Sequence, residues 1–271
     1  VKHPFMTLNA RQTPTALTIA GSDPSGGAGI QADLKVFHHL GVYGMSVLTL
    51  LTVQNTEGVE AVEVLKPEFV SRQLKAVLED IPPRAAKTGA LGSAGVIREI
   101  STAALEFDFP LIVDPVAVST HGARLIDEDA VEILRDELLP ASYLLTPNLA
   151  EAALLSGLKV ETLDQMKDAA EKLHALGAKN VLVKGGHLDD DAVDVLLSEQ
   201  GIELLHGPRF NTAHTHGTGC VLSAAITAYL SLGDDLNEAT RKAKSFVSRG
   251  IEKNPGLGKG SGPIHLWPEN S

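Results

Sequence analysis

The sequence predicts an α/β protein with a mainly parallel sheet that is covered by helices on both faces. Short apolar, partly β-branched segments alternate with longer segments of helical spacing. Hydrophobic residues make up 44% of the 271 residues, which is enough for a full core. Strands that alternate with helices are joined by crossovers, and crossovers make neighbouring strands parallel. We expect one domain over residues 15–271, after a flexible extension over residues 1–14.

The first unit is a strand, a loop and a helix. Ala16–Ala20 is the expected strand, residues 21–29 form a glycine-rich loop, and Ile30–Leu40 has helical spacing. The pattern then recurs. We expect further strands at Ser46–Val53, Leu111–Val113, Tyr143–Thr146 and Val181–Lys184, and further helices at Pro67–Asp80, Ala94–Leu105, Asp129–Leu138 and Leu163–Leu176.

The C-terminal third is expected to end the sheet. Ala192–Ser198 and Ile202–His206 flank Glu199-Gln200-Gly201, which predicts a hairpin near a sheet edge. Residues 237–271 are expected to begin as a helix and to end as an irregular, glycine-rich tail.

Composition limits the partners and the compartment. The formal charge of −11 disfavours nucleic acid or an anionic membrane as a partner, because surplus Lys and Arg hold both. It does not disfavour ATP, which responds to the local field. The single cysteine excludes an internal disulfide, and neither a transmembrane-length apolar segment nor a signal peptide is evident, so we expect a cytoplasmic protein.

A glycine-rich turn before an apolar helix is the most informative motif. Gly217, Thr218 and Gly219 precede Cys220 and the apolar segment Val221–Leu230. Backbone N–H groups at such a helix start bind anions, and the glycines let an oxyanion approach closely. A thiol at this position is expected to have a lowered pKa and to accept a proton from a hydroxyl group, so the motif indicates phosphoryl transfer to an alcohol.

Two other interpretations of this turn remain open. Cys220 is a small, buried helix-start residue in the first, and the glycines only turn the chain. In the second, His214, His216 and Cys220 bind a metal, although no Cys-x-x-Cys pair supports a zinc site.

Polar residues also follow several expected strands. Asp114 ends one strand, Asn148 and Glu151 begin the helix after another, and Lys184 ends a third. Ligands in such sheets bind at the carboxyl ends of the strands. The acids either cap a helix or, with the amide, hold Mg²⁺ through water, and Lys184 is either solvated or beside a phosphate. His38 and His39 receive no role.

Taken together, seven ordered segments resemble the ribokinase-like kinases, and within them the hydroxymethylpyrimidine/phosphomethylpyrimidine kinases of thiamine biosynthesis. The resemblance spans about residues 16–266, and its motifs are Ala16–Asp33, Val53–Gly58, Lys87-Thr88-Gly89, Thr146–Glu151, Lys184–Leu188, His216–Cys220 and Gly258–Pro263. It implies a ribokinase-like three-layer sandwich. It also implies ATP-dependent phosphorylation of 4-amino-5-hydroxymethyl-2-methylpyrimidine to its monophosphate and then to its diphosphate.

The resemblance further implies roles for individual residues. Gln54 would recognise the aminopyrimidine edge, because its amide has a donor and an acceptor. Gly217, Thr218 and Gly219 would form the anion hole, with Cys220 as the base. The other implied positions are Asp23, Ala28, Val116 and Ala90 around the pyrimidine, Lys184, Asn148, Thr218 and Lys259 at ATP, and Glu151 and Asp114 at Mg²⁺.

Two departures bear on the acceptor. Ala90 follows Lys87-Thr88-Gly89 where many members carry a methionine, and Thr120-His121-Gly122 replaces a Lys-Ser-Gly loop. Both leave a pyridoxal kinase on the same scaffold as the alternative, and a non-catalytic ligand sensor is the hypothesis from another class. The family and symmetry preferences favour a homodimer.

Overall fold

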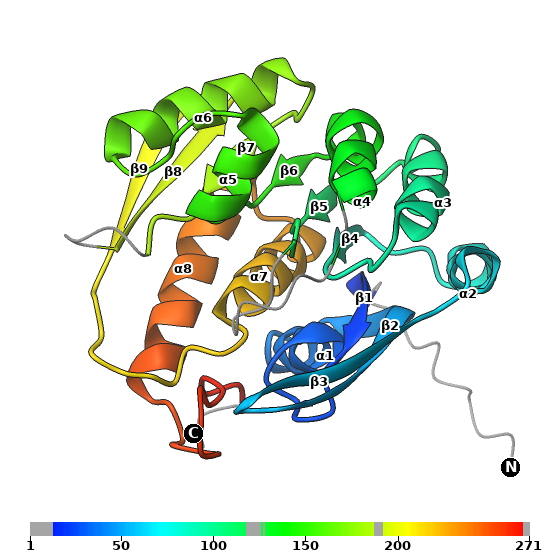
Figure 1. Ribbon diagram of the computed structural model, residues 1–271, viewed down its shortest axis with the longest axis horizontal. Helices are drawn as coiled ribbons and strands as arrows, with labels where there is room; N and C mark the ends of the chain where they lie inside the picture. Colours follow the sequence, from blue (N-terminus) through cyan, green and yellow to red (C-terminus); the bar gives the residue numbers. More distant parts are fainter. Residues whose placement is uncertain (1–12, 118–125, 127, 187–191, 268–271) are drawn as a thin grey trace, which may run out of the picture.

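The computed structural model describes residues 13–117, 126, 128–186 and 192–267. Within these residues nine strands form one sheet, in the order β3-β2-β1-β4-β5-β6-β7-β8-β9 (Figure 1). Strands β2, β1, β4, β5, β6 and β7 pair in parallel, while β3, β8 and β9 are antiparallel to their neighbours. The bounds are β1 Thr15–Ser22, β2 Tyr43–Asn55, β3 Gly58–Val64, β4 Ala85–Thr88, β5 Leu111–Val113, β6 Leu144–Leu145, β7 Val181–Val183, β8 Ala192–Ser198 and β9 Gly201–Gly207.

Helices cover both faces of this sheet (Figure 1). Helices α1 (Gly29–His39), α7 (Thr218–Leu232) and α8 (Leu236–Glu252) share one hydrophobic core, and α2, α3, α4 and α6 belong to the core on the other face. The bounds of the latter and of α5 are α2 Pro67–Asp80, α3 Ala94–Ala104, α4 Glu128–Ile133, α5 Leu149–Ser156 and α6 Leu163–Ala175. The predicted three-layer α/β fold is confirmed.

The short central strands contribute side chains to the hydrophobic cores on both faces of the sheet. In β5, Ile112 joins the core under α7 and α8, while Leu111 and Val113 join the opposite core. In β7, Leu182 and its two valine neighbours divide in the same way. Alternate side chains of a strand point to opposite faces, so a strand covered on both sides is apolar at every position.

Most expected elements lie where the sequence placed them. Pro67–Asp80 and Leu111–Val113 agree with the structure at both ends, and the hairpin of β8 and β9 ends the sheet. The expected helix over Asp129–Leu138 differs, because α4 ends at Ile133 and continues as a π-helical turn, Leu134–Leu138. Strands β3 and β4 were not predicted. Most of the expected extension, residues 1–12, lies outside the described part of the chain.

The parallel strands bring several chain segments to one edge of the sheet. Asp114, Thr146 and Lys184 follow β5, β6 and β7 at their carboxyl ends. The chain segment before α7 also pairs with the C-terminal loop through a bridge between His216 and Pro263. No helix in the described part is long and apolar enough to cross a membrane.

Candidate active site

The first turn of α7 lies against the glycine-rich loop that follows β1. Gly217 precedes the helix with a φ of 78°, and a Cβ at this position would collide with the Gly27 carbonyl oxygen. Thr218 and Gly219 are the first residues of the helix. The first N–H groups of a helix have no partner within it, and they lie at the positive end of its dipole. This turn therefore has the geometry of the predicted anion cradle.

A lysine and a carboxylate lie beside this turn. Lys184 Nζ is 3.0 Å from Asp114 Oδ1, and a Cβ on Gly219 would lie 3.2 Å from the same ammonium nitrogen. Ser223 Oγ donates to Asp114 Oδ2 at 3.2 Å. Burial lowers the pKa of Lys184, but Asp114 and Glu151 raise it, and the net direction is upward. The lysine is thus a permanent cation next to the helix N-terminus.

Glu151 and Asn148 form the cap of α5. Asn148 Oδ1 accepts from the Glu151 N–H at 2.9 Å, and Glu151 Oε2 accepts from the Asn148 N–H at 2.9 Å. Glu151 Oε1 accepts from the Ala117 N–H at 3.2 Å. Burial raises the pKa of Glu151, while Lys184 opposes the rise. The capping interpretation of Asn148 and Glu151 is therefore confirmed. Asn148 also forms an isolated parallel β-bridge with Lys184, so the cap lies beside this lysine.

The two acids do not form a closed metal cage. Within the described ranges, no three His, Cys, Asp or Glu side chains are grouped so that they could hold a metal, and this includes His214, His216 and Cys220. Asp114 and Glu151 use both oxygens in hydrogen bonds, but each carboxylate oxygen keeps a further lone pair. Such oxygens suit Mg²⁺ held through water, because this ion keeps several of its waters.

Beneath the same turn lies a fully buried ion pair. Lys87 Nζ is 2.9 Å from Asp33 Oδ2, and both side chains are 0% exposed. Thr18 Oγ1 donates to the same oxygen at 2.6 Å. Burial lowers the pKa of Lys87, but Asp33, Cys220 and Asp114 raise it above its usual value. The pair thus places a second cation close to Cys220.

The prediction for the acidity of Cys220 is wrong. Burial raises the pKa of this thiol to about 11. Lys87 lowers it, whereas Asp114 and Asp33 raise it further. The cysteine side chain is only half-exposed to solvent at the helix start, so desolvation of the thiolate outweighs the favourable dipole. In the ligand-free protein Cys220 is a thiol at neutral pH.

A second group of polar residues surrounds the loop after β1. Asp23 Oδ1 accepts from the backbone N–H and the Oγ of Ser25, at 2.9 and 2.7 Å. Asp23 Oδ2 accepts from the Ala28 N–H at 2.9 Å. Gln31 donates to Ser22 Oγ and accepts from the Asp23 N–H. Asp23 therefore fixes its own loop, and Ala28 lies half-buried at the start of α1.

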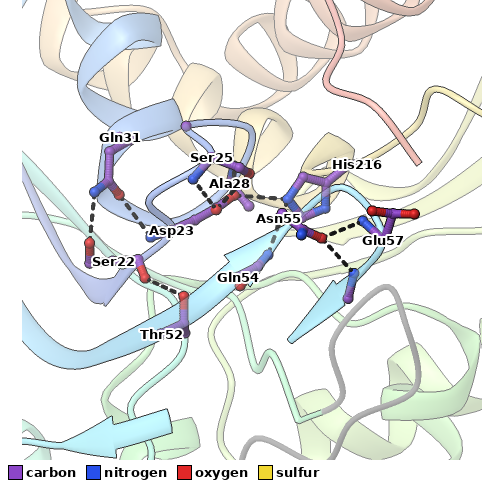
Figure 2. Close-up of polar contacts among 12 residues, drawn as sticks. Ser22, Asp23, Ser25, Ala28, Gln31, Thr52, Gln54, Asn55, Glu57 and His216 are labelled. Carbon is purple, nitrogen blue, oxygen red and sulfur yellow. Dashed lines mark hydrogen bonds and ion pairs between the residues drawn. The ribbon is translucent and has the colours of Figure 1, made fainter. Parts of the chain in front are cut away.

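His216 joins this loop to strand β2. Its Nε2 is 2.8 Å from Asp23 Oδ2 and 3.3 Å from Gln54 Nε2, and Figure 2 shows the imidazole between these two side chains. The imidazole is buried at 3% exposure. A β-bulge at Val53 and Gln54 interrupts the pairing of β2 with β3. Bulges redirect side chains and occur often beside active sites.

The other expected pyrimidine contacts lie on two further loops. Ala90 follows β4, and its carbonyl oxygen accepts from Thr49 Oγ1 at 2.6 Å. Val116 has a φ of 40°, which is strained for a β-branched residue. Backbone strain of this kind gathers at functional sites.

Lys259 lies on the C-terminal loop, next to the turn between β2 and β3. Its N–H and that of Gly260 donate to Thr56 Oγ1, at 3.2 and 3.3 Å. The structure thus brings the loop of Lys259 close to the β2–β3 turn after Gln54 and to the segment that contains His214.

Sequence reasoning left three of the polar residues at this edge without a role. The sequence indicates His216 only as a possible metal ligand. Asp33 and Lys87 lie within motifs, and no local pattern predicts the ion pair between them. Thr120-His121-Gly122 and His187-Leu188 lie outside the described residues.

Comparison with known proteins identifies the family of this chain. A family model described as phosphomethylpyrimidine kinase matches residues 23–265. The thiamine biosynthesis bifunctional protein ThiED of Geobacter sulfurreducens is 47% identical over 93% of this chain, and the chain spans about half of that protein, 52%. A hydroxymethylpyrimidine/phosphomethylpyrimidine kinase of Bacillus subtilis is 45% identical over 92% of this chain and 93% of its own length.

Solved structures agree with this result. A phosphomethylpyrimidine kinase of Clostridium difficile is 45% identical, with a TM-score of 0.78 over 88% of this chain and 99% of its own. A pyridoxal kinase of Staphylococcus aureus, solved in complex with pyridoxal, is 37% identical, with a TM-score of 0.86 over 93% of each chain. The family model over residues 23–265 and the relative that is 45% identical over 92% of this chain show that this chain belongs to the phosphomethylpyrimidine kinase family.

Proposed function

We propose that the protein transfers the γ-phosphoryl group of ATP to the hydroxymethyl oxygen of 4-amino-5-hydroxymethyl-2-methylpyrimidine, and then phosphorylates the monophosphate to the diphosphate for thiamine biosynthesis. The observation that carries the proposal is the loop from Thr215 to Cys220. Its end forms the anion cradle beside Lys184, and His216 within it contacts Gln54. One short loop thus joins the part of the site that would bind phosphate to the part in which the Gln54 amide would recognise the acceptor.

The phosphate half would act mainly by positioning and by charge. The N–H groups at the start of α7 and the Lys184 ammonium would stabilise the charge on the transferred group, which is the main demand of phosphoryl transfer. Asn148 lies beside Lys184, and Lys259 would approach the nucleotide from the C-terminal loop. Mg²⁺, held through water by Asp114 and Glu151, would supply neutralisation of the nucleotide charge.

Cys220 would receive the proton of the attacking hydroxyl group. The new bond forms between the hydroxymethyl oxygen and the γ-phosphorus, the bond to the bridging oxygen breaks, and ADP leaves. A thiol with a pKa of about 11 must first lose its own proton to solvent water, and the thiolate then takes the proton of the hydroxyl group. Lys87, which lowers the pKa of Cys220, is the cation that would stabilise the thiolate. General-base assistance typically contributes ~10²–10⁴-fold, so the cradle and Lys184 would matter at least as much.

The acceptor half would bind the aminopyrimidine at Gln54. An amide offers one donor and one acceptor, which match a ring nitrogen beside an exocyclic amine. Asp23 would hold the loop that carries Ala28, while Val116 and Ala90 would line the pocket. Ala90 has a small side chain, so the pocket would admit acceptors with different kinds of ring.

Pyridoxal is the second candidate acceptor. Pyridoxal kinases of similar fold, with TM-scores of 0.83–0.86, are 36–38% identical to this chain. Pyridoxal also carries a hydroxymethyl group on a heteroaromatic ring. Its ring has no amine next to a ring nitrogen. A Gln54 amide that is placed to bind such a nitrogen and amine would therefore keep polar groups without partners when pyridoxal is bound.

Several broader features belong to the same proposal. Residues 15–271 would form one kinase domain, working in the cytoplasm as a homodimer that binds ATP and small acceptors but neither nucleic acid nor membrane. A sensor without catalysis would have no use for the Lys184, Cys220 and Gly219 arrangement, and transfer above background would exclude it.

The test is ATP- and Mg²⁺-dependent turnover by the purified protein, with products resolved by mass. We expect both pyrimidine phosphates to form. Faster phosphorylation of pyridoxal than of the pyrimidine would overturn the acceptor assignment. ATP turnover with neither acceptor would overturn both.

A further inference from the structure

Asp23, His216 and Gln54 form a chain of polar contacts from the loop after β1 to strand β2 (Figure 2). His216 Nε2 is the shared atom, 2.8 Å from Asp23 Oδ2 and 3.3 Å from Gln54 Nε2. A single ring nitrogen is therefore in contact with a carboxylate on one side and an amide on the other.

The carboxylate determines where the imidazole proton lies. Asp23 accepts hydrogen bonds from the Ser25 N–H, the Ser25 hydroxyl and the Ala28 N–H. Burial raises the pKa of Asp23, but the hydrogen bonds from His216 and Ser25 lower it, and the net direction is downward. An ionised carboxylate only accepts, so His216 Nε2 carries the hydrogen and donates it to Asp23.

This assignment limits the amide of Gln54. A nitrogen that carries a hydrogen and donates it cannot accept from the Gln54 NH₂ group. A half-turn of the amide exchanges its oxygen and nitrogen, and Oε1 then shares the Nε2 hydrogen of His216 with Asp23 Oδ2 in a three-centre hydrogen bond. The oxygen and nitrogen of an amide are assigned from their hydrogen-bond partners, and only this orientation gives the pair a bond.

We propose that His216 is a positioning residue that holds Gln54 Oε1, and so sets which end of the amide meets the acceptor amine and which meets the ring nitrogen. This inference rests on the proposed function. Oε1 has two lone pairs, so it accepts from His216 and from the exocyclic amine together, while Nε2 donates to the ring nitrogen. A ring bound the other way round would bring its amine against the NH₂ group. One ring orientation is thereby selected.

The surroundings keep the imidazole in place. Its ring packs on Gly27, where a Cβ would lie 2.6 Å from Cδ2, and the backbone N–H of His216 donates to the Gly262 carbonyl oxygen at 3.1 Å. The pairing of β2 with β3 shifts register between Val53 and Gln54, and the Gln54 side chain points toward the imidazole (Figure 2). The imidazole of His216 is therefore held in one position, and the amide of Gln54 is the group that rotates to match it.

The loop after β1 does not depend on His216 alone. Asp23 keeps its three bonds from Ser25 and Ala28, and Gln31 still accepts from the Asp23 N–H, when the imidazole is removed. A role in amide orientation is therefore separable from a role in holding the loop.

The test compares two acceptor rings. The first is the aminopyrimidine, and the second is its 4-oxo analogue, in which a ring N–H and a carbonyl replace the ring nitrogen and the amine. The oxo ring needs the opposite amide orientation. We expect the wild type to favour the amino ring by about 100-fold in kcat/KM, the value of two matched hydrogen bonds. In His216→Phe we expect this ratio to fall to within a few-fold, with the KM for ATP unchanged.

Ser25→Ala is the matched control, because it removes a bond to Asp23 without a contact to Gln54. We expect it to keep the amino-to-oxo ratio of the wild type. His216→Asn serves if the phenylalanine variant does not fold, since its amide can donate to Asp23 but is too short to reach both partners. A loss of preference for the amino ring again supports the inference.

The outcomes separate the two proposals. A ratio that is the same in the wild type and in both His216 variants overturns the role of His216 and leaves the proposed function intact. If the wild type phosphorylates neither ring, the proposed function fails and the inference fails with it. Nitrogen NMR of the ligand-free wild type reads the histidine directly, and a His216 Nε2 without its hydrogen would overturn the inference whatever the activity.

Discussion

Lys184 Nζ lies 3.0 Å from Asp114 Oδ1, and this ion pair joins the ends of two parallel strands beside the first turn of α7. The cation therefore has two neighbours of opposite kind, a carboxylate that neutralises it and a helix start that binds anions. An incoming phosphate would take over the role of the carboxylate.

Lys184→Met should abolish most of the phosphoryl transfer. Loss of a fixed charge at the transferred group typically costs ~10²–10³-fold in kcat, and we expect a fall in that range. Steady-state kinetics with varied ATP measures it. Lys167→Met is the control, because Lys167 pairs with Asp164 in the first turns of α6 and makes no contact with Lys184 or Asp114. Equal losses in both variants would contradict a role specific to Lys184.

Cys220 should react slowly with iodoacetamide at neutral pH. Because the pKa of its thiol is about 11, the fraction of reactive thiolate is small at pH 7. The alkylation rate should continue to rise between pH 9 and 11. Intact mass follows the reaction cleanly, since the chain has one cysteine. Fast alkylation at pH 7 would instead restore the lowered pKa that the helix dipole suggests.

The same shift predicts a pH dependence of stability. Below pH 9 the folded and unfolded chains both hold the thiol proton, so Cys220 favours neither. Between pH 9 and 11 the unfolded chain loses the proton while the folded chain keeps it, and the free energy of unfolding falls as the pH rises. Urea titrations of wild type and Cys220→Ala should diverge only in that window.

Lys87→Met should strongly destabilise the fold. The change leaves Asp33 buried without its cation, which costs about 3–5 kcal/mol, and Lys87→Met with Asp33→Asn should recover a large part of it. Denaturant unfolding measures both. Lys75→Met removes a surface pair with Glu79 and should change stability by less than about 1 kcal/mol. A mild effect of Lys87→Met would mean that water reaches the pair.

Glu151→Gln should raise the Mg²⁺ concentration needed for half-maximal activity. The amide oxygen still accepts from the Asn148 N–H, so the cap of α5 persists, while the charge and the hydrogen bond from the Ala117 N–H are lost. Asp235→Asn, at the cap of α8, is the control and should leave the Mg²⁺ dependence unchanged. An unchanged Mg²⁺ requirement in Glu151→Gln would limit this residue to capping.

The layers of the fold could be predicted because strands β5, β6 and β7 are apolar at every position. β5 and α2 were predicted to the residue, since Leu111–Val113 is uniformly apolar and Pro67 marks a helix start. β3 was missed because Glu60 and Glu63 interrupt an exposed edge strand. β4 was missed because Lys87 lies within its four residues, and only a partner 54 positions away explains a buried lysine there.

The site could be predicted in its parts but not in its connections. Glycine and helix patterns predicted the turn at the start of α7, and the expected strand ends placed Asp114 and Lys184 after β5 and β7. The thiol pKa was predicted in the wrong direction, because a sequence pattern reports the helix dipole but not the desolvation of Cys220. The contact of His216 with Asp23 joins positions 193 residues apart, and no local pattern indicates such a pair.

That separation also bears on how the protein is made. Asp23 and Gln54 leave the ribosome before His216 and before the Gly262 carbonyl that holds the His216 backbone. Contacts between such distant positions form late, because the loop they close costs the most entropy. A nascent chain can therefore pair β1 with β2 while it still lacks His216, and the contacts that join Asp23 to Gln54 through this imidazole are added to strands that already exist.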